Sequence, residues 1–197
     1  MNKQDKNHGG NVNGMKAVDL KRRQLLKATG AAAVAGCAIH AAPAQADDAP
    51  GMVKGDLLVL SKGDATAPLK ADDIKVGTKP VLVWPFDLNE KKARSESRLN
   101  KLMLVRVDPA DMTPEMKAVS ANGVIAYSAI CTHQGCDVTE FVAADKLLMC
   151  FCHFSKFNPG DGSVAKGPAA KSLPHVPLAE KDGLLVIAGS FSNKPGV

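Results

Sequence analysis

Two short stretches near the middle of the chain decide its fold: Cys131-Thr132-His133-Gln134-Gly135-Cys136 and Cys150-Phe151-Cys152-His153-Phe154-Ser155. Four of the five cysteines fall within these stretches, and the fifth, Cys37, lies near the N-terminus. Each stretch also holds a histidine, and the one other histidine after residue 46 is His175. Cysteine and histidine side chains clustered in this way are typical of metal sites.

The spacing separates the candidate cofactors. Zinc modules usually show two Cys-x2-4-Cys or His-x3-5-His pairs. Here the order is Cys-x-His-x2-Cys, and sixteen residues separate His133 from Cys150, which opens the pattern Cys-x-Cys-His. A pair of structural disulfides is a second alternative outside the cytoplasm, but it leaves His133 and His153 unexplained.

The pattern Cys-x-His followed by Cys-x-x-His resembles the Rieske iron–sulfur family, over roughly residues 124–188. The resemblance implies one 2Fe-2S cluster, with Cys131 and Cys150 as thiolate ligands of one iron and His133 and His153 as imidazole ligands of the other. It also implies a disulfide between Cys136 and Cys152, as in exported members. Two neutral imidazoles in place of two thiolates remove negative charge, so such clusters have potentials of about −150 to +300 mV.

The resemblance extends to the residues around the ligands. Ser155 matches a hydroxyl that donates to a bridging sulfide, and Gly167 with Pro168 matches a Gly/Pro-rich loop that covers the cluster. Phe157 stands where many quinol-oxidising members have a tyrosine, whose hydroxyl bonds a ligand sulfur. Gln134 replaces an apolar residue at the tip of the first loop, and Phe151 and Phe154 replace Pro and Gly in the second. These departures put the quinol-docking role in doubt.

Short apolar runs punctuated by turn residues predict a mainly antiparallel all-β domain. With the resemblance, this becomes a Rieske-like antiparallel β domain over residues 56–197, with two cluster-binding loops and a Gly/Pro-rich covering loop. Thr113 followed by Pro114 predicts one helical turn. The densely charged segment 89–98 is expected at the surface, and segment 158–177 is expected to be irregular and to have a functional role. The expected strands are Leu57–Leu60, Val81–Trp84, Leu102–Val107, Val124–Ala129, Leu147–Phe151 and Leu184–Ile187.

The N-terminal segment has a separate character. Residues 1–46 hold seven basic and two acidic side chains, so the whole formal charge of +5 lies there and residues 47–197 are neutral. Basicity confined to a leader gives no support to nucleic-acid binding, and we expect no nucleic-acid partner.

This leader resembles a twin-arginine export signal. Arg22-Arg23 precede the weakly apolar segment 28–46, and Ala44-Gln45-Ala46 fits a small-x-small cleavage site. Residues 47–55 then form a tether, and the mature protein is expected in the periplasm. Two alternatives stay open, an uncleaved membrane anchor and lipidation of Cys37, and only these would attach the chain to a membrane.

These features predict one-electron transfer without a substrate site of the chain's own. Trp84-Pro85-Phe86 and the run 152–157 resemble the small subunit of arsenite oxidase. The expected partner is therefore the catalytic large subunit of such a molybdenum enzyme, or a cytochrome, with small carriers such as cytochrome c. The alternative is the iron–sulfur subunit of a cytochrome bc-type quinol–cytochrome c reductase. A Rieske oxygenase component is a third class, but it needs a second iron site with two more histidines and a carboxylate, and only His175 is left over.

Overall fold

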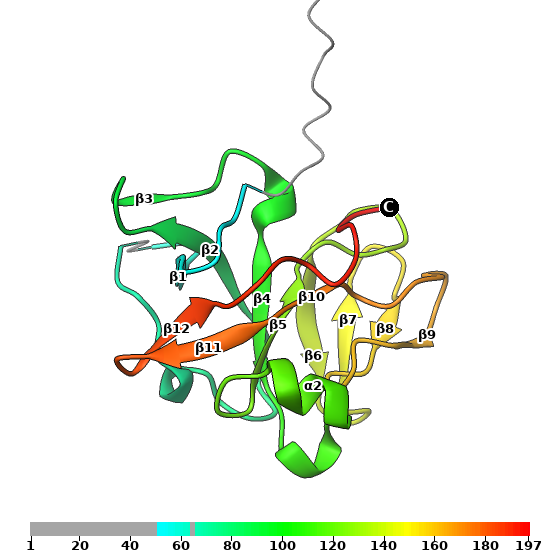
Figure 1. The fold of residues 1–197 in the computed structure, drawn as a ribbon. Coiled ribbons are helices and arrows are strands. Elements are labelled where there is room, and N and C mark those ends of the chain that lie inside the picture. The colour runs from blue at the N-terminus through cyan, green and yellow to red at the C-terminus, as the bar shows by residue number, and fades with distance from the viewer. Residues whose placement is uncertain (1–50, 64–65) are drawn as a thin grey trace, which may run out of the picture. The chain divides into compact units, whose positions relative to one another are not determined.

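The computed structural model describes residues 51–63 and 66–197 (Figure 1). The expected export signal, its cleavage site and Cys37 lie outside the described residues, as does the first part of the tether. Within the described residues, no helix is long and apolar enough to cross a membrane.

Two antiparallel sheets make up most of the described chain (Figure 1), so the prediction of an antiparallel all-β domain is confirmed. The larger sheet has the order β10-β5-β4-β2-β1-β12-β11, with β3 paired to β2. Its strands are β1 (Leu57–Leu60), β2 (Val81–Asp87), β3 (Lys92–Ala93), β4 (Leu102–Arg106), β5 (Val124–Ser128), β10 (His175–Val176), β11 (Leu178–Lys181) and β12 (Leu184–Ile187). The smaller sheet has the order β6-β7-β8-β9, made of β6 (Val138–Val142), β7 (Leu147–Cys150), β8 (Lys156–Phe157) and β9 (Val164–Lys166).

Helical structure among the described residues is short. The predicted helical turn is α2 (Pro114–Val119), where the Thr113 hydroxyl accepts a hydrogen bond from the Met116 N–H at 3.3 Å. This side-chain oxygen satisfies one of the N–H groups that a helix start leaves without a partner. Single 3-10 turns occur at Ala71–Asp73, Arg98–Asn100 and Pro109–Asp111.

Strands β4 and β5 are buried on both faces and carry the core. Side chains alternate along a strand, so Leu102 and Leu104 enter one apolar cluster while Met103 and Val105 enter another. The first cluster also contains Leu58, Val83 and Leu185, which come from other strands of the larger sheet. A continuous apolar run at β4 is therefore explained by burial on two sides.

The second apolar cluster joins the two sheets. Tyr127 of β5 packs there with Val138 of β6, Leu148 of β7 and Phe157 of β8, all fully buried. Tyr127 also donates a hydrogen bond from its hydroxyl to the Pro159 carbonyl oxygen at 2.9 Å. The smaller sheet is thus fixed on the β4–β5 face, and the loop that precedes β6 lies beside the C-terminus (Figure 1).

Packing at the N-terminal edge begins before Asp56. Met52 packs against the core of the larger sheet, and the Gly55 N–H donates to the Ile187 carbonyl oxygen at 2.8 Å. The buried Asp56 carboxylate accepts from the Val53 N–H at 2.7 Å and from Arg94 Nε at 2.8 Å. The last residues of the expected tether are therefore held by the domain.

Candidate metal centre

Strand pairing brings the two cysteine-containing stretches together. We call residues 131–136 loop 1 and residues 150–155 loop 2. Loop 1 precedes β6 and loop 2 begins at the end of β7, and these strands pair with Val138 opposite Cys150. Both loops therefore leave the same end of one hairpin.

Each loop is closed by its own backbone hydrogen bonds. In loop 1, the Cys131 N–H donates to the Cys136 carbonyl oxygen at 2.7 Å, and the Gly135 N–H donates to the Cys131 carbonyl oxygen at 3.0 Å. Gly135 has a positive φ of 75°, which glycine adopts without strain. In loop 2, the Cys150 N–H donates to the Ser155 carbonyl oxygen at 2.9 Å.

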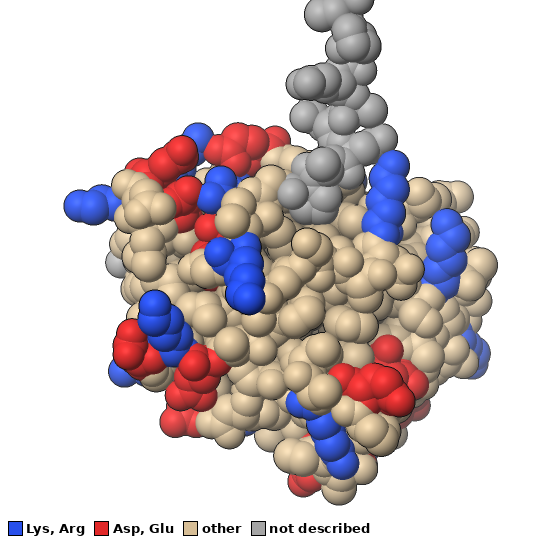
Figure 2. Space-filling view, in the orientation of Figure 1, with Lys and Arg blue, Asp and Glu red and all other residues tan. Residues whose placement is uncertain are grey.

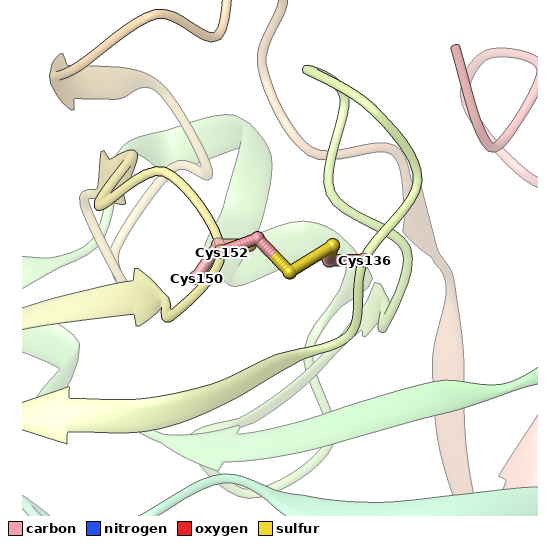
Figure 3. Close-up of side chains that lie close together, drawn as sticks. All are labelled: Cys136, Cys150 and Cys152. Carbon is pink, nitrogen blue, oxygen red and sulfur yellow. A yellow bond between two sulfur atoms is a disulfide. The ribbon is translucent and has the colours of Figure 1, made fainter.

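A disulfide between Cys136 and Cys152 joins the two loops, with their Cα atoms 6.5 Å apart (Figure 3). The sulfur atoms of Cys136, Cys150 and Cys152 lie within 4.8 Å of one another. Because the disulfide uses two of these sulfurs, Cys150 is the thiol of this group that stays free to bind a metal.

Cys131 and Cys150 are both free thiols and both buried, at 2% and 1% exposure. Burial raises the pKa of the Cys131 thiol, and the adjacent Cys150 thiol raises that pKa further. The backbone N–H groups of His133 and Gln134 oppose this rise, because they donate towards the Cys131 sulfur. A bound cation would favour both thiolates, since metal binding displaces thiol protons.

The two loop histidines lie against each other. The ring centroids of His133 and His153 are 4.7 Å apart, with the ring planes at 84°. The Nδ1 atom of His133 is buried and has no hydrogen-bond partner among the described residues. Leaving such a nitrogen unbonded costs about 1–3 kcal/mol, and a metal bond would satisfy it. Two buried thiols and this unpartnered imidazole nitrogen fit a cluster that takes two sulfur and two nitrogen ligands.

The Gly/Pro-rich segment 166–172, which we call loop 3, packs directly on loop 2. Gly167 has a φ of 102°, and a Cβ atom added there would lie 2.6 Å from the Ser155 Cα. Only glycine permits so close an approach of two backbones. The buried Ser155 Oγ accepts a hydrogen bond from the Ala169 N–H at 3.1 Å, which leaves its own hydrogen free to donate. Pro168, between these contacts, is exposed.

Two further contacts hold loop 1 from outside the motif. The Thr132 hydroxyl donates to the Lys171 carbonyl oxygen at 2.6 Å, which ties loop 1 to loop 3. Arg98 donates through one nitrogen to the Gly135 carbonyl oxygen at 2.6 Å and to Asp137 at 3.2 Å. Each pair is separated by more than 35 residues, so no local sequence pattern predicts these contacts.

Two further residues that the sequence singled out, Phe157 and His175, lie outside the candidate ligand set. Phe157 is fully buried in the cluster of side chains that also contains Cys131 and Cys150, and it brings no hydroxyl there. His175 begins β10, outside loops 1 to 3, and its backbone N–H donates to the Ser192 hydroxyl at 3.1 Å. Burial lowers the pKa of His175.

Buried thiols and adjacent imidazoles on the loops of an antiparallel domain fit the two-cysteine, two-histidine ligand set of one class of iron–sulfur protein. The chain belongs to the Rieske family: the profile described as "Rieske [2Fe-2S] domain" matches residues 64–177. The cofactor of this domain is a 2Fe-2S cluster, which supplies a one-electron redox couple when bound.

Relatives of the chain are subunits of respiratory complexes. The chain is 32% identical over 148 residues to the "Cytochrome bc1 complex Rieske iron-sulfur subunit" of Streptomyces lividans, covering 73% of this chain and 85% of that protein. It is 42% identical over 76 residues to the "Putative respiratory nitrate reductase subunit Rieske" of Haloferax mediterranei, covering 38% of this chain and 34% of that protein. A Rieske subunit of Streptomyces coelicolor is likewise covered over 41% of its length.

Among solved structures, the chain is similar to the cyanobacterial plasma membrane Rieske protein PetC3 from Synechocystis PCC 6803. The TM-score is 0.40 and the sequence identity is 20%, over 60% of this chain and 93% of that one.

Proposed function

We propose that the chain transfers single electrons through a 2Fe-2S cluster held by Cys131, Cys150, His133 and His153. The observation that carries this assignment is the unpartnered, buried His133 Nδ1, which lies on the same loop as the buried Cys131 thiol. The disulfide removes Cys136 and Cys152 from the ligand set, so the four remaining loop side chains supply two sulfur and two nitrogen ligands.

We further propose that the chain serves as a subunit or partner of a periplasmic oxidoreductase. Two kinds of complex have specific support. The similarity to bc1 subunits over 148 residues favours a cytochrome bc-type complex. The exposed Gln134 at the tip of loop 1 and the absence of a hydroxyl at Phe157 favour a molybdenum oxidoreductase of the arsenite oxidase type, because quinol-oxidising members have an apolar residue and a tyrosine at these two positions.

Export by the twin-arginine route would deliver this protein to the periplasm. The support is the sequence around Arg22-Arg23 and the disulfide, which needs an oxidising compartment. Changing both arginines to lysine should keep the full chain in the cytoplasm, as measured by fractionation. An exported double variant would contradict the route.

Electron paramagnetic resonance (EPR) of the dithionite-reduced full chain tests the cluster. We expect an average g value below that of all-cysteine ferredoxins, and loss of this signal in His153→Gln. The matched control is His175→Gln, which changes a histidine outside the loops and should keep the signal. A ferredoxin-type signal in the wild type, or an unchanged signal in His153→Gln, would contradict the ligand assignment.

Purification of the complex from its native source separates the two candidates. Molybdenum and a large catalytic subunit in the purified complex would support the arsenite oxidase type. A b-type haem would support the cytochrome bc-type complex.

A further inference from the structure

Exposed apolar side chains gather at the end of the molecule that holds loops 1 and 2. Three of the large apolar side chains that are more than a third exposed lie there. Phe151 and Phe154 belong to loop 2. A methyl carbon of Val197 lies 3.7 Å from where a Cβ atom would stand on Gly135 in loop 1. The full set among the described residues is Val53, Leu60, Val76, Leu88, Phe151, Phe154 and Val197. Clustered exposed apolar groups mark interaction sites, whereas single ones are ordinary.

The two phenylalanines form one aromatic patch. Phe151 is 59% exposed and Phe154 is 58% exposed, and their ring centroids are 6.2 Å apart. Between them in the chain stand Cys152 and His153, so the patch borders one of the two loop histidines. Aromatic side chains that are exposed in the free protein and desolvated on docking are typical anchors of protein interfaces.

The backbone at Phe154 is itself unfavourable. Its φ is +59°, in the left-handed region that glycine adopts readily and bulky residues avoid. A glycine here would remove both the backbone strain and the exposed ring. Strain of this kind persists mostly at functional sites. The Phe154 ring is 58% exposed in the isolated chain, so much of the benefit of an aromatic side chain here is expected in a complex.

The charged side chains within loops 1, 2 and 3 are all positive. Loops 1, 2 and 3 together contain Lys166 and Lys171 and no acidic residue. Arg98 adds a further cation at the Gly135 carbonyl oxygen, while the nearby Asp137 is bound by Arg98 and by Lys101. On the face shown in Figure 2, the upper right part shows Lys and Arg side chains and no Asp or Glu.

We propose that Phe151 and Phe154 anchor the docking of an acidic redox protein, with Lys171 and Arg98 in the charged rim. This inference rests on the proposed electron-transfer function, because the patch borders His153. An apolar anchor within a basic rim fits a protein whose own redox centre lies under an apolar patch ringed by carboxylates. Charge complementarity would speed encounter, and burial of the two rings would slow dissociation.

The test uses the cluster-loaded full chain and one probe in two charge states. A basic cytochrome c and the same cytochrome c with its lysines succinylated present one haem fold with opposite surface charge. We expect the succinylated form to bind more tightly in surface plasmon resonance and to be reduced faster in stopped-flow experiments. Both advantages should shrink as salt is added.

The variants separate the anchor from the rim. Phe151→Ser combined with Phe154→Gly should weaken binding of the succinylated form by about tenfold, as expected for loss of an aromatic anchor. Lys171→Glu should mainly slow association and reduce its salt dependence. The matched controls are Leu88→Ser, since Leu88 is 57% exposed in the β2–β3 turn, and Lys181→Glu at the end of β11. Neither control should change binding.

The outcomes distinguish this inference from the proposed function. A wild-type chain without the expected EPR signal contradicts the cluster assignment. With the signal intact, equal or tighter binding of the basic cytochrome overturns the acidic partner. Unchanged binding in the double phenylalanine variant, with its EPR signal retained, overturns the anchor. Because Phe154→Gly relieves strain, that variant is expected to fold at least as well as the wild type.

Discussion

The Gly167→Ala substitution tests whether loop 3 holds loop 2 by direct backbone contact. The added methyl group would lie 2.6 Å from the Ser155 Cα and 3.1 Å from the Phe154 carbonyl oxygen. Both neighbours are backbone atoms that cannot rotate away, so the two loops must separate. Separation also breaks the hydrogen bond from the Ala169 N–H to Ser155 Oγ, a loss of about 1 kcal/mol.

The magnitude follows from four contributions. A non-glycine residue at positive φ costs about 1–2 kcal/mol, and alanine recovers about 0.4–1 kcal/mol by restricting the unfolded chain. Adding the lost hydrogen bond and the overlap gives about 2–4 kcal/mol for Gly167→Ala. For a domain of this size, the melting temperature falls by about 2–4 °C for each kcal/mol. We therefore expect a decrease of about 5–10 °C.

Gly183→Ala is the matched control, because Gly183 has a φ of 76° and no atom within 4 Å of an added Cβ. It carries the cost of positive φ without the overlap, and its melting temperature should fall by only about 1–3 °C. The assay is thermal loss of visible circular dichroism from the cluster-loaded protein at one scan rate. Equal decreases in the two variants would refute the close backbone contact.

Three further perturbations probe the ligand environment, the N-terminal edge and the pH dependence. Phe157→Tyr should raise the midpoint potential in protein-film voltammetry by about 60 mV, since a new hydroxyl donor would favour the reduced state by about 1.4 kcal/mol. An unchanged midpoint potential would contradict this prediction. Arg94→Ala should lower the free energy of unfolding by about 3 kcal/mol, because it leaves the buried Asp56 carboxylate without its cation. Adding Asp56→Asn to this variant should recover part of the lost stability. His175 has a lowered pKa in the folded state, so the unfolded chain binds its proton more readily, and the stability should fall as the pH falls below about 6.5. His175→Gln should flatten this dependence of the melting temperature on pH. The same slope in the variant and the wild type would contradict the prediction.

The strands that the sequence predicted are those with nearly continuous apolar runs. β1 and β12 begin and end at the predicted residues, and β5 is buried along its whole length. β6 escaped prediction because only Val138 is fully buried there, while Thr139 and Glu140 interrupt the apolar pattern. β8 and β10 have two residues each, which is too short for any periodicity to show.

In the site too, residues close together in the sequence could be predicted, whereas contacts between distant segments could not. Cys131 with His133, and Cys150 with His153, lie within single loops, so their spacing carried the family resemblance that made them candidate ligands. The disulfide was expected from the family resemblance and is present in the structure. The bond from Thr132 to Lys171 could not be predicted, because it depends on how two loops 39 residues apart meet in the fold.

The contacts around loop 1 explain how an exposed metal site could stay ordered on loops. Loops usually open by local unfolding, because few buried contacts hold them. Here each direction of opening breaks a different long-range bond. Movement away from loop 2 is opposed by the disulfide, movement away from loop 3 by Thr132, and movement of the Gly135 turn by Arg98. The ligand side chains can therefore keep their positions as the charge of the site changes, and the exposed phenylalanines can be presented to a partner without loosening the loop that carries them.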